Sequence, residues 1–145
     1  MSVNIAETFE LLLDKNNNVA YKALQLLQKE SEERNCVYPY MHRLSDMLDS
    51  ENSYIRTRGL TLLAYNAKWD KDNKIDEYLK HITDIKPITA RQCIKLLPII
   101  AEYKPELKND IIYALHKANI SIYGDSMQSL VHKDIQKALN EIQNL

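Results

Sequence analysis

SYIRTRGLTLLAYNA, residues Ser53–Ala67, is the stretch of the chain that decides the fold. Placed at the 100° per residue of an α-helix, its apolar side chains occupy one wide arc, which also includes Gly59. An arc of this width is expected for a helix that packs on more than one side. Glycine in a helix interior costs roughly 1 kcal/mol relative to alanine, so Gly59 predicts the close approach of a second helix.

The same pattern recurs on both sides of this stretch. Residues 19–27 match residues 55–63 at a shift of 36 residues, and residues 89–97 match them at a shift of 34. Each aligned position forms a row of three residues, and most rows are leucine or isoleucine. One row is β-branched and consists of Val19, Ile55 and Thr89. Another row is small and consists of Ala23, Gly59 and Cys93. A second helical stretch precedes each match. A helical pair that repeats at this interval is typical of an α-solenoid.

Hydrophobic periodicity along the rest of the chain predicts an all-α protein of eight helices. These are expected within residues 2–14, 18–33, 35–49, 53–69, 74–83, 88–103, 106–118 and 125–143. About four antiparallel pairs would then stack into a short right-handed α–α superhelix, with residues 1–145 as a single domain. The last helix departs from the repeat, as a terminal capping repeat does.

A resemblance to a known family rests on the run IRxxGxxLL at residues 55–63. It resembles the second helix of a HEAT repeat, whose pattern is Val-Arg-x-x-Ala-x-x-Ala-Leu, and implies a HEAT/armadillo-like α-solenoid. In that family the arginine ties neighbouring repeats together through a loop aspartate, which implies a structural role for Arg56. The other two repeats carry Ala20 and Ala90 there, and the aspartate position is Ser50. The chain is also similar to small bacterial HEAT-like proteins of unassigned function, some of which are linked to iron–sulfur assembly.

Composition narrows the class of protein. The chain of 145 residues has a net charge of −1 and lacks the basic excess expected of a dedicated nucleic-acid binder. It has neither a signal-peptide pattern nor an apolar run long enough to cross a bilayer, so we expect a cytoplasmic protein without a membrane partner. Cys36 and Cys93 form no CxxC motif, and Cys93, in the small row, is expected to be a buried packing residue.

Motifs that carry chemistry are absent from the sequence. It contains no phosphate-binding glycine loop, metalloprotease motif, nucleophile elbow or EF-hand loop. None of the four histidines, His42, His81, His116 and His132, has a second ligand at metal spacing on its own helix. We therefore expect no enzymatic activity, no cofactor and no metal site.

The outward positions of the second helices predict a binding surface. Transferring those of residues 57–68 through the repeat alignment gives Tyr21, Lys22, Gln25, Lys29, Thr57, Arg58, Thr61, Tyr65, Lys68, Arg91, Gln92 and Lys95. Six of these twelve residues are lysine or arginine and none is acidic. Such edges line the concave face of an α-solenoid, and tyrosine and arginine are enriched in binding hot spots. The predicted partner-binding set is Tyr21, Lys22, Arg58, Tyr65, Lys68, Arg91 and Lys95, with Arg58 and Arg91 pointing to solvent.

Two functional hypotheses from different classes follow. The first is a non-catalytic scaffold that binds a protein or peptide partner on this concave face. The partner segment is expected to carry acidic residues. An accessory role in iron–sulfur cluster assembly is a variant of this first hypothesis. The second is a nucleic-acid-handling module similar to the HEAT-like DNA glycosylases, whose binding would weaken steeply with salt. The same face also fits an ordinary solvated helical surface that binds nothing.

Overall fold

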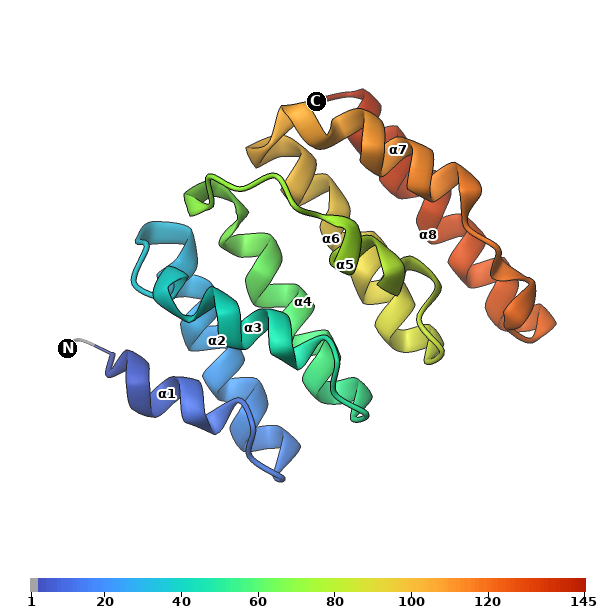
Figure 1. The fold of residues 1–145 in the computed structure, drawn as a ribbon. Helices are drawn as coiled ribbons and strands as arrows, with labels where there is room; N and C mark the ends of the chain where they lie inside the picture. The colour runs from blue at the N-terminus through green and yellow to red at the C-terminus, as the bar shows by residue number, and fades with distance from the viewer. Residues whose placement is uncertain (1–2) are drawn as a thin grey trace. The chain divides into compact units, whose positions relative to one another are not determined.

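The computed structural model describes residues 3–145, and over this range the chain is all-α, with eight α-helices and no strand (Figure 1). This confirms the predicted fold class. The chain divides into two compact units, one ending at Asp70 and the other beginning at Lys71, while the single domain over residues 1–145 stays a prediction. None of the helices in the described range combines the length and hydrophobicity needed to span a bilayer.

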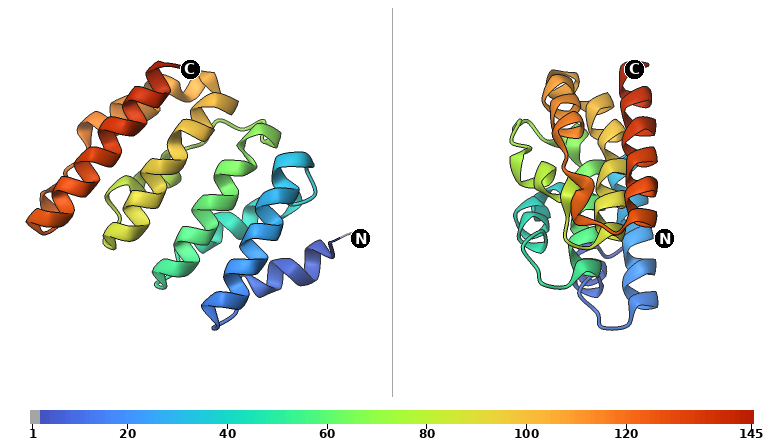
Figure 2. Two further views of the ribbon diagram at one scale, coloured as in Figure 1. Left: turned by 180° about the vertical axis from the view of Figure 1, so that it is seen from behind. Right: turned by 90° about the vertical axis from the view of Figure 1, so that its right-hand side faces the viewer.

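The first unit holds two of the predicted helical pairs, together with two short 3₁₀ helices. Its elements are α1 (Ile5–Leu11), α2 (Asn17–Glu33), η1 (Tyr38–Tyr40), α3 (Met41–Met47), α4 (Ser53–Tyr65) and η2 (Ala67–Trp69). α2 and α4 lie side by side, α1 packs on α2, and α3 packs on α4 (Figure 2). The core between them consists of Phe9, Leu12, Ala23, Leu27, Val37, Leu44, Met47 and Leu62.

Asparagine side chains fix the starts of three helices in this unit. Asn4, Asn16 and Asn52 each precede a helix and accept a hydrogen bond from a backbone N–H of its first turn. The Asn52 bond to the Tyr54 N–H, for example, is 2.9 Å long. Because these N–H groups have no partner within the helix, the caps decide where α1, α2 and α4 begin. The helix expected over residues 2–14 is therefore shorter in the described range, and Ser2 lies outside that range.

The small-residue row lies buried, as predicted. A Cβ placed on Gly59 would lie 3.0 Å from the Cβ of Met47 and 3.1 Å from the carbonyl oxygen of Leu44, so α3 crosses α4 almost at van der Waals contact. Ala23 and Cys93 are also buried. The Cys93 thiol lies 3.6 Å from the Tyr78 carbonyl oxygen, and burial raises the pKa of this thiol well above its usual value.

A buried polar contact joins the ends of α2 and α4. The Asn66 side-chain amide donates to the Ser31 hydroxyl at 2.9 Å and to the Leu62 carbonyl at 2.8 Å. The Trp69 indole N–H donates to the Ser31 carbonyl at 2.7 Å. These bonds accompany the end of α4 at Tyr65, where η2 replaces the helix that was expected to continue to residue 69.

The second unit holds the other two helical pairs. Its elements are α5 (Asp76–Leu79), η3 (Lys80–Thr83), α6 (Pro87–Tyr103), η4 (Pro105–Leu107), α7 (Lys108–Lys117), η5 (Ile120–Ile122) and α8 (Asp125–Gln143). α6 and α8 lie side by side, and α5–η3 and α7 pack on the other side of the unit (Figures 1 and 2). Its fully buried side chains include Ile94, Leu97, Ile111, Leu115, Val131 and Ile142. The helix expected over residues 74–83 is a single α-turn continued by a 3₁₀ helix.

Asp84 organises one end of this unit. Its carboxylate lies 2.7 Å from Nδ1 of His81 and accepts the backbone N–H of Lys86 at 2.9 Å. Its carbonyl oxygen accepts the hydroxyl of Tyr123, which follows η5. The loop between η3 and α6 and the loop between η5 and α8 are therefore held side by side. Burial, with Asp84 and Cys93 nearby, raises the pKa of Tyr123 from 10.0 to about 12.

The raised pKa of Tyr123 predicts a loss of stability at alkaline pH. The folded protein keeps this phenol neutral up to about pH 12, whereas the unfolded chain ionises it near pH 10. The free energy of unfolding should therefore fall as pH rises through this window, by about 1–2 kcal/mol from this group. Urea denaturation at a series of pH values should show a steeper alkaline decline for the wild type than for Tyr123→Phe. Parallel declines would contradict the assignment.

Candidate functional site

The predicted partner-binding residues lie on α2, on α4 with η2, and on α6, and they differ sharply in exposure. On α2, Tyr21 and Lys22 are exposed, as predicted, together with Gln25 and Lys29. At 100° per residue these four side chains fall in one arc of the helix, which no other helix of the unit covers. Tyr21 is 58% exposed and lies at one edge of the arc.

Leu26 lies at the other edge of the same arc. Its exposure differs from that of the residues aligned with it in the repeat. It occupies the leucine row of Leu62 and Leu96, both of which are buried, yet its side chain is 46% exposed. The exposed face of α2 is defined by Tyr21, Lys22, Gln25, Leu26 and Lys29, a set in which two large apolar groups flank two ammonium groups. A partner that covered this face would remove both apolar side chains from water.

Arg58 does not point to solvent, so this part of the prediction is wrong. Its side chain is 6% exposed, and its guanidinium donates to the Leu12 carbonyl oxygen and to Oδ1 of Asn17, both at 2.8 Å. The acceptors stand at the two ends of the connection between α1 and α2, because Leu12 follows α1 and Asn17 begins α2. Burial lowers the pKa of Arg58. The side chain runs along the helix surface and anchors α4 to this connection, because arginine buries its stem while its head finds acceptors.

Of the remaining predicted positions on α4 and η2, Thr57, Tyr65 and Lys68 are half-buried. Thr61 is buried, and its hydroxyl donates to the Thr57 carbonyl oxygen at 2.9 Å. The Lys68 ammonium donates to the Glu32 carbonyl oxygen and lies 4.9 Å from the centroid of the Trp69 ring. α4 therefore offers less free surface than α2, although the two helices match in sequence.

On α6 the predicted basic character is partly neutralised. The guanidinium of Arg91 forms a forked ion pair with Asp134 on α8, with Nε lying 2.6 Å and one Nη lying 3.4 Å from the two carboxylate oxygens. This contact raises the pKa of Arg91. Lys95, one turn further along, is exposed. The alignment of three repeats missed Asp134 because the last helix does not follow the repeat.

Arg56, for which the HEAT resemblance implies a structural role, contacts the loop before α4, and the role itself stays a prediction. Arg56 is buried, and its guanidinium donates to the carbonyl oxygens of Ser50 and Glu51 at 3.0 and 3.2 Å. Backbone carbonyls of the preceding loop thus replace the aspartate side chain of the family pattern. Within residues 3–145 no group of three or more histidine, cysteine and acidic side chains is placed to hold a metal ion.

The family model described as a HEAT repeat domain matches residues 2–139 of the chain. This range includes all the residues of the predicted surface and the helices α1 to α7. No curated protein and no solved structure matches.

The different environments of Arg58 and Lys22, which occupy the same row of the repeat, give a direct test. Arg58→Glu should lower the free energy of unfolding by about 2–4 kcal/mol, because it places a carboxylate against buried carbonyl oxygens. Lys22→Glu changes the same charge on an exposed position of α2 and should stay within about 0.5 kcal/mol of the wild type. Urea denaturation measures both. Equal stability of the two variants would show that Arg58 is not an anchor.

Proposed function

Because the chain belongs to the HEAT repeat family, we propose that it is a non-catalytic scaffold that binds a protein partner on the exposed face of α2. HEAT repeats are commonly protein-interaction scaffolds. The observation that supports this site is the composition of the face, defined above by five residues. A tyrosine and a leucine there remain exposed although burial of each would be favourable by about 1.5–3 kcal/mol.

The charge of this face selects the chemistry of the partner. Lys22 and Lys29 lie two turns apart on α2, and both are exposed. Around the helix axis they lie between the exposed side chains of Tyr21 and Leu26. A segment that carries acidic residues next to apolar ones would pair with the ammonium groups and cover the two apolar side chains. The ammonium groups would contribute mainly to the rate of association and to specificity, and the tyrosine would contribute most of the affinity.

The second unit of the chain, unit 2, contains α6, and the basic residues predicted on α6 do not form part of the proposed site. Lys95 stays available on α6, but Arg91 already has Asp134 as its ion-pair partner. An acidic segment that used Arg91 would have to compete with that carboxylate. The proposed contact residues are therefore Tyr21, Lys22 and Lys29, with Tyr65 and Lys68 as secondary positions in the same unit and Arg58 excluded by its burial.

The proposal is tested by affinity capture from lysate of the native cell, followed by mass spectrometry. Lys22→Glu with Lys29→Glu should reduce capture of the specific protein partner at least about tenfold, because two attractive pairs become repulsive. Tyr21→Ala should give a loss of similar size. The matched control is Lys133→Glu with Lys137→Glu, two exposed lysines on α8, which should capture the partner as the wild type does.

Two results would contradict the proposal. One is equal capture by the α2 variant and the α8 control. The other is capture that disappears after nuclease treatment, which would favour the nucleic-acid-handling alternative.

A further inference from the structure

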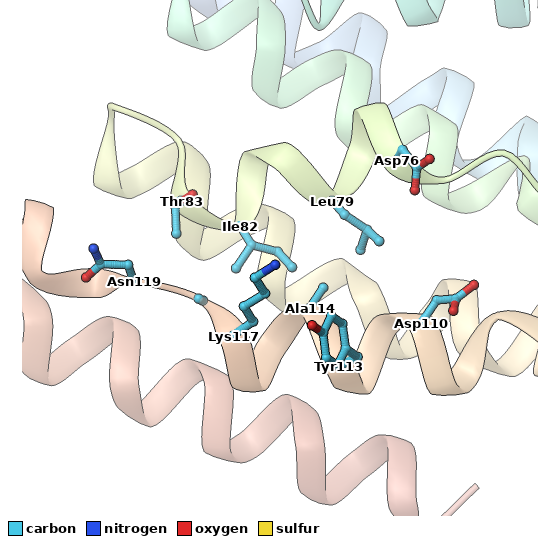
Figure 3. A pocket seen from close by; sticks show the side chains of 10 residues that line it. Asp76, Leu79, Ile82, Thr83, Asp110, Tyr113, Ala114, Lys117 and Asn119 are labelled. Atoms are coloured by element: carbon cyan, nitrogen blue, oxygen red, sulfur yellow. The ribbon is translucent and has the colours of Figure 1, made fainter.

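Unit 2 contains a groove on the side opposite α8, between α5–η3 and α7. Its volume is about 400 Å³ (Figure 3). One wall is the segment from Asp76 to Thr83, and the other runs along α7 from Asp110 to Lys117 and on to Asn119. Neither wall belongs to the second helices of the repeats, so this groove is separate from the face of α2 and was not part of the predicted surface.

The two ends of the groove differ in charge. Asp76 and Asp110 lie on opposite walls at the same end, each in the first turn of its helix (Figure 3). Both are exposed, and among residues 3–145 neither has an ion-pair partner. Lys117 extends into the groove from the last turn of α7, towards Ile82 on the facing wall (Figure 3). A ligand therefore meets two carboxylates at one end and one ammonium group further along.

Apolar side chains lie between these charges. Leu79 and Ile82 contribute to one wall, and Tyr113 with Ala114 to the other (Figure 3). Tyr113 is 66% exposed, and the Lys117 ammonium lies 5.6 Å from the centroid of its ring. The ring thus has one contact with a cation and a large remaining surface that a ligand can cover.

Exposure and charge decide which class of ligand fits. A pocket for a small molecule encloses most of its ligand, whereas this groove leaves its largest side chain mostly in water. Nucleic acid is disfavoured because two carboxylates at one end would repel phosphate groups. A segment of a protein in extended conformation remains, because it needs an open channel and carries charged and apolar side chains in sequence.

We propose that this groove binds an extended segment of a partner protein, with a lysine or arginine held between Asp76 and Asp110 and an apolar side chain placed against Tyr113. Tyr113 follows Asp110 by three residues of α7, a rise of about 4.5 Å, which equals about one or two extended residues. The apolar residue therefore follows or precedes the basic one by about one or two positions. Lys117 disfavours a second basic residue at its end of the groove, so the basic residue of the segment lies at the Asp76 and Asp110 end.

The proposal goes beyond the function assigned to α2, because the site lies in the other unit and prefers the opposite charge. Selection from a display library of random peptides of about twelve residues, against the full chain, provides the probe. Selected peptides should carry a lysine or arginine about one or two positions from an apolar residue. Absence of any selected peptide, or selection of peptides without a basic residue, would overturn the proposal.

The best selected peptide is then measured by fluorescence anisotropy against four variants. Asp76→Asn with Asp110→Asn should raise its Kd about tenfold, since two ion pairs are lost without any new repulsion. Tyr113→Ala, at a mostly exposed position that should not disturb folding, should raise the Kd by a similar factor. Asp125→Asn is the matched control, because it too removes a carboxylate from the first turn of a helix but lies outside the groove. It should leave the Kd unchanged.

The fourth variant separates this proposal from the proposed function. Lys22→Glu with Lys29→Glu should bind the peptide as the wild type does, even if it loses its partner in affinity capture. A Kd that changes only in this α2 variant, or one that is unchanged in the Asp76/Asp110 variant, would overturn the groove as the site. A dimer of the wild type that Tyr113→Ala dissociates in sedimentation would assign the groove to a second copy of the chain, and would overturn the proposal as well.

Discussion

The contact between α3 and α4 at Gly59 is the constraint on which the first unit depends. With 3.0 Å between the position of a Cβ on Gly59 and the Cβ of Met47, the two helix backbones approach as closely as side chains permit. This approach leaves α4 buried over most of its surface, so even its polar residues must find partners inside the protein. Arg56 does so by donating to a backbone carbonyl oxygen of the loop between α3 and α4, and Arg58 to one of the loop between α1 and α2. The close crossing and the buried arginines are thus two consequences of one packing arrangement.

Much of the architecture was predictable because packing rows repeat in the sequence. Ala23, Gly59 and Cys93 are all buried, and the eight helices lie where periodicity placed them. The first helices of the pairs were less predictable. α5 has only four residues and continues as a 3₁₀ helix, so it offers too few turns for a period of 3.6 residues to be recognised. The groove of unit 2 is built on this helix and on α7, and for that reason the periodic pattern did not predict it.

Exposure was the property that the repeat alignment could not supply. Lys22 and Arg58 occupy the same row, yet the first lies in solvent and the second anchors a loop, because only Arg58 has carbonyl and amide oxygens within reach. Leu26 and Leu62 also share a row, yet Leu26 is exposed and Leu62 is buried. A row records which way a side chain points on its helix, but burial depends on what the neighbouring helices cover. The two surfaces that result differ in charge: the α2 face has two lysines, and the groove of unit 2 has two carboxylates at one end.

If the close crossing at Gly59 holds α3 on α4, two matched serine substitutions should differ in their effect on stability. Gly59→Ser adds a Cβ within 3.0 Å of Met47, whereas Gly124→Ser adds one where no atom lies within 4 Å. Urea denaturation should show that Gly59→Ser loses about 1–3 kcal/mol of unfolding free energy, despite its better helix propensity. Gly124→Ser, which places a preferred capping residue before α8, should be unchanged or slightly more stable. Equal stability of Gly59→Ser and the wild type would show that the close crossing at Gly59 does not hold α3 on α4.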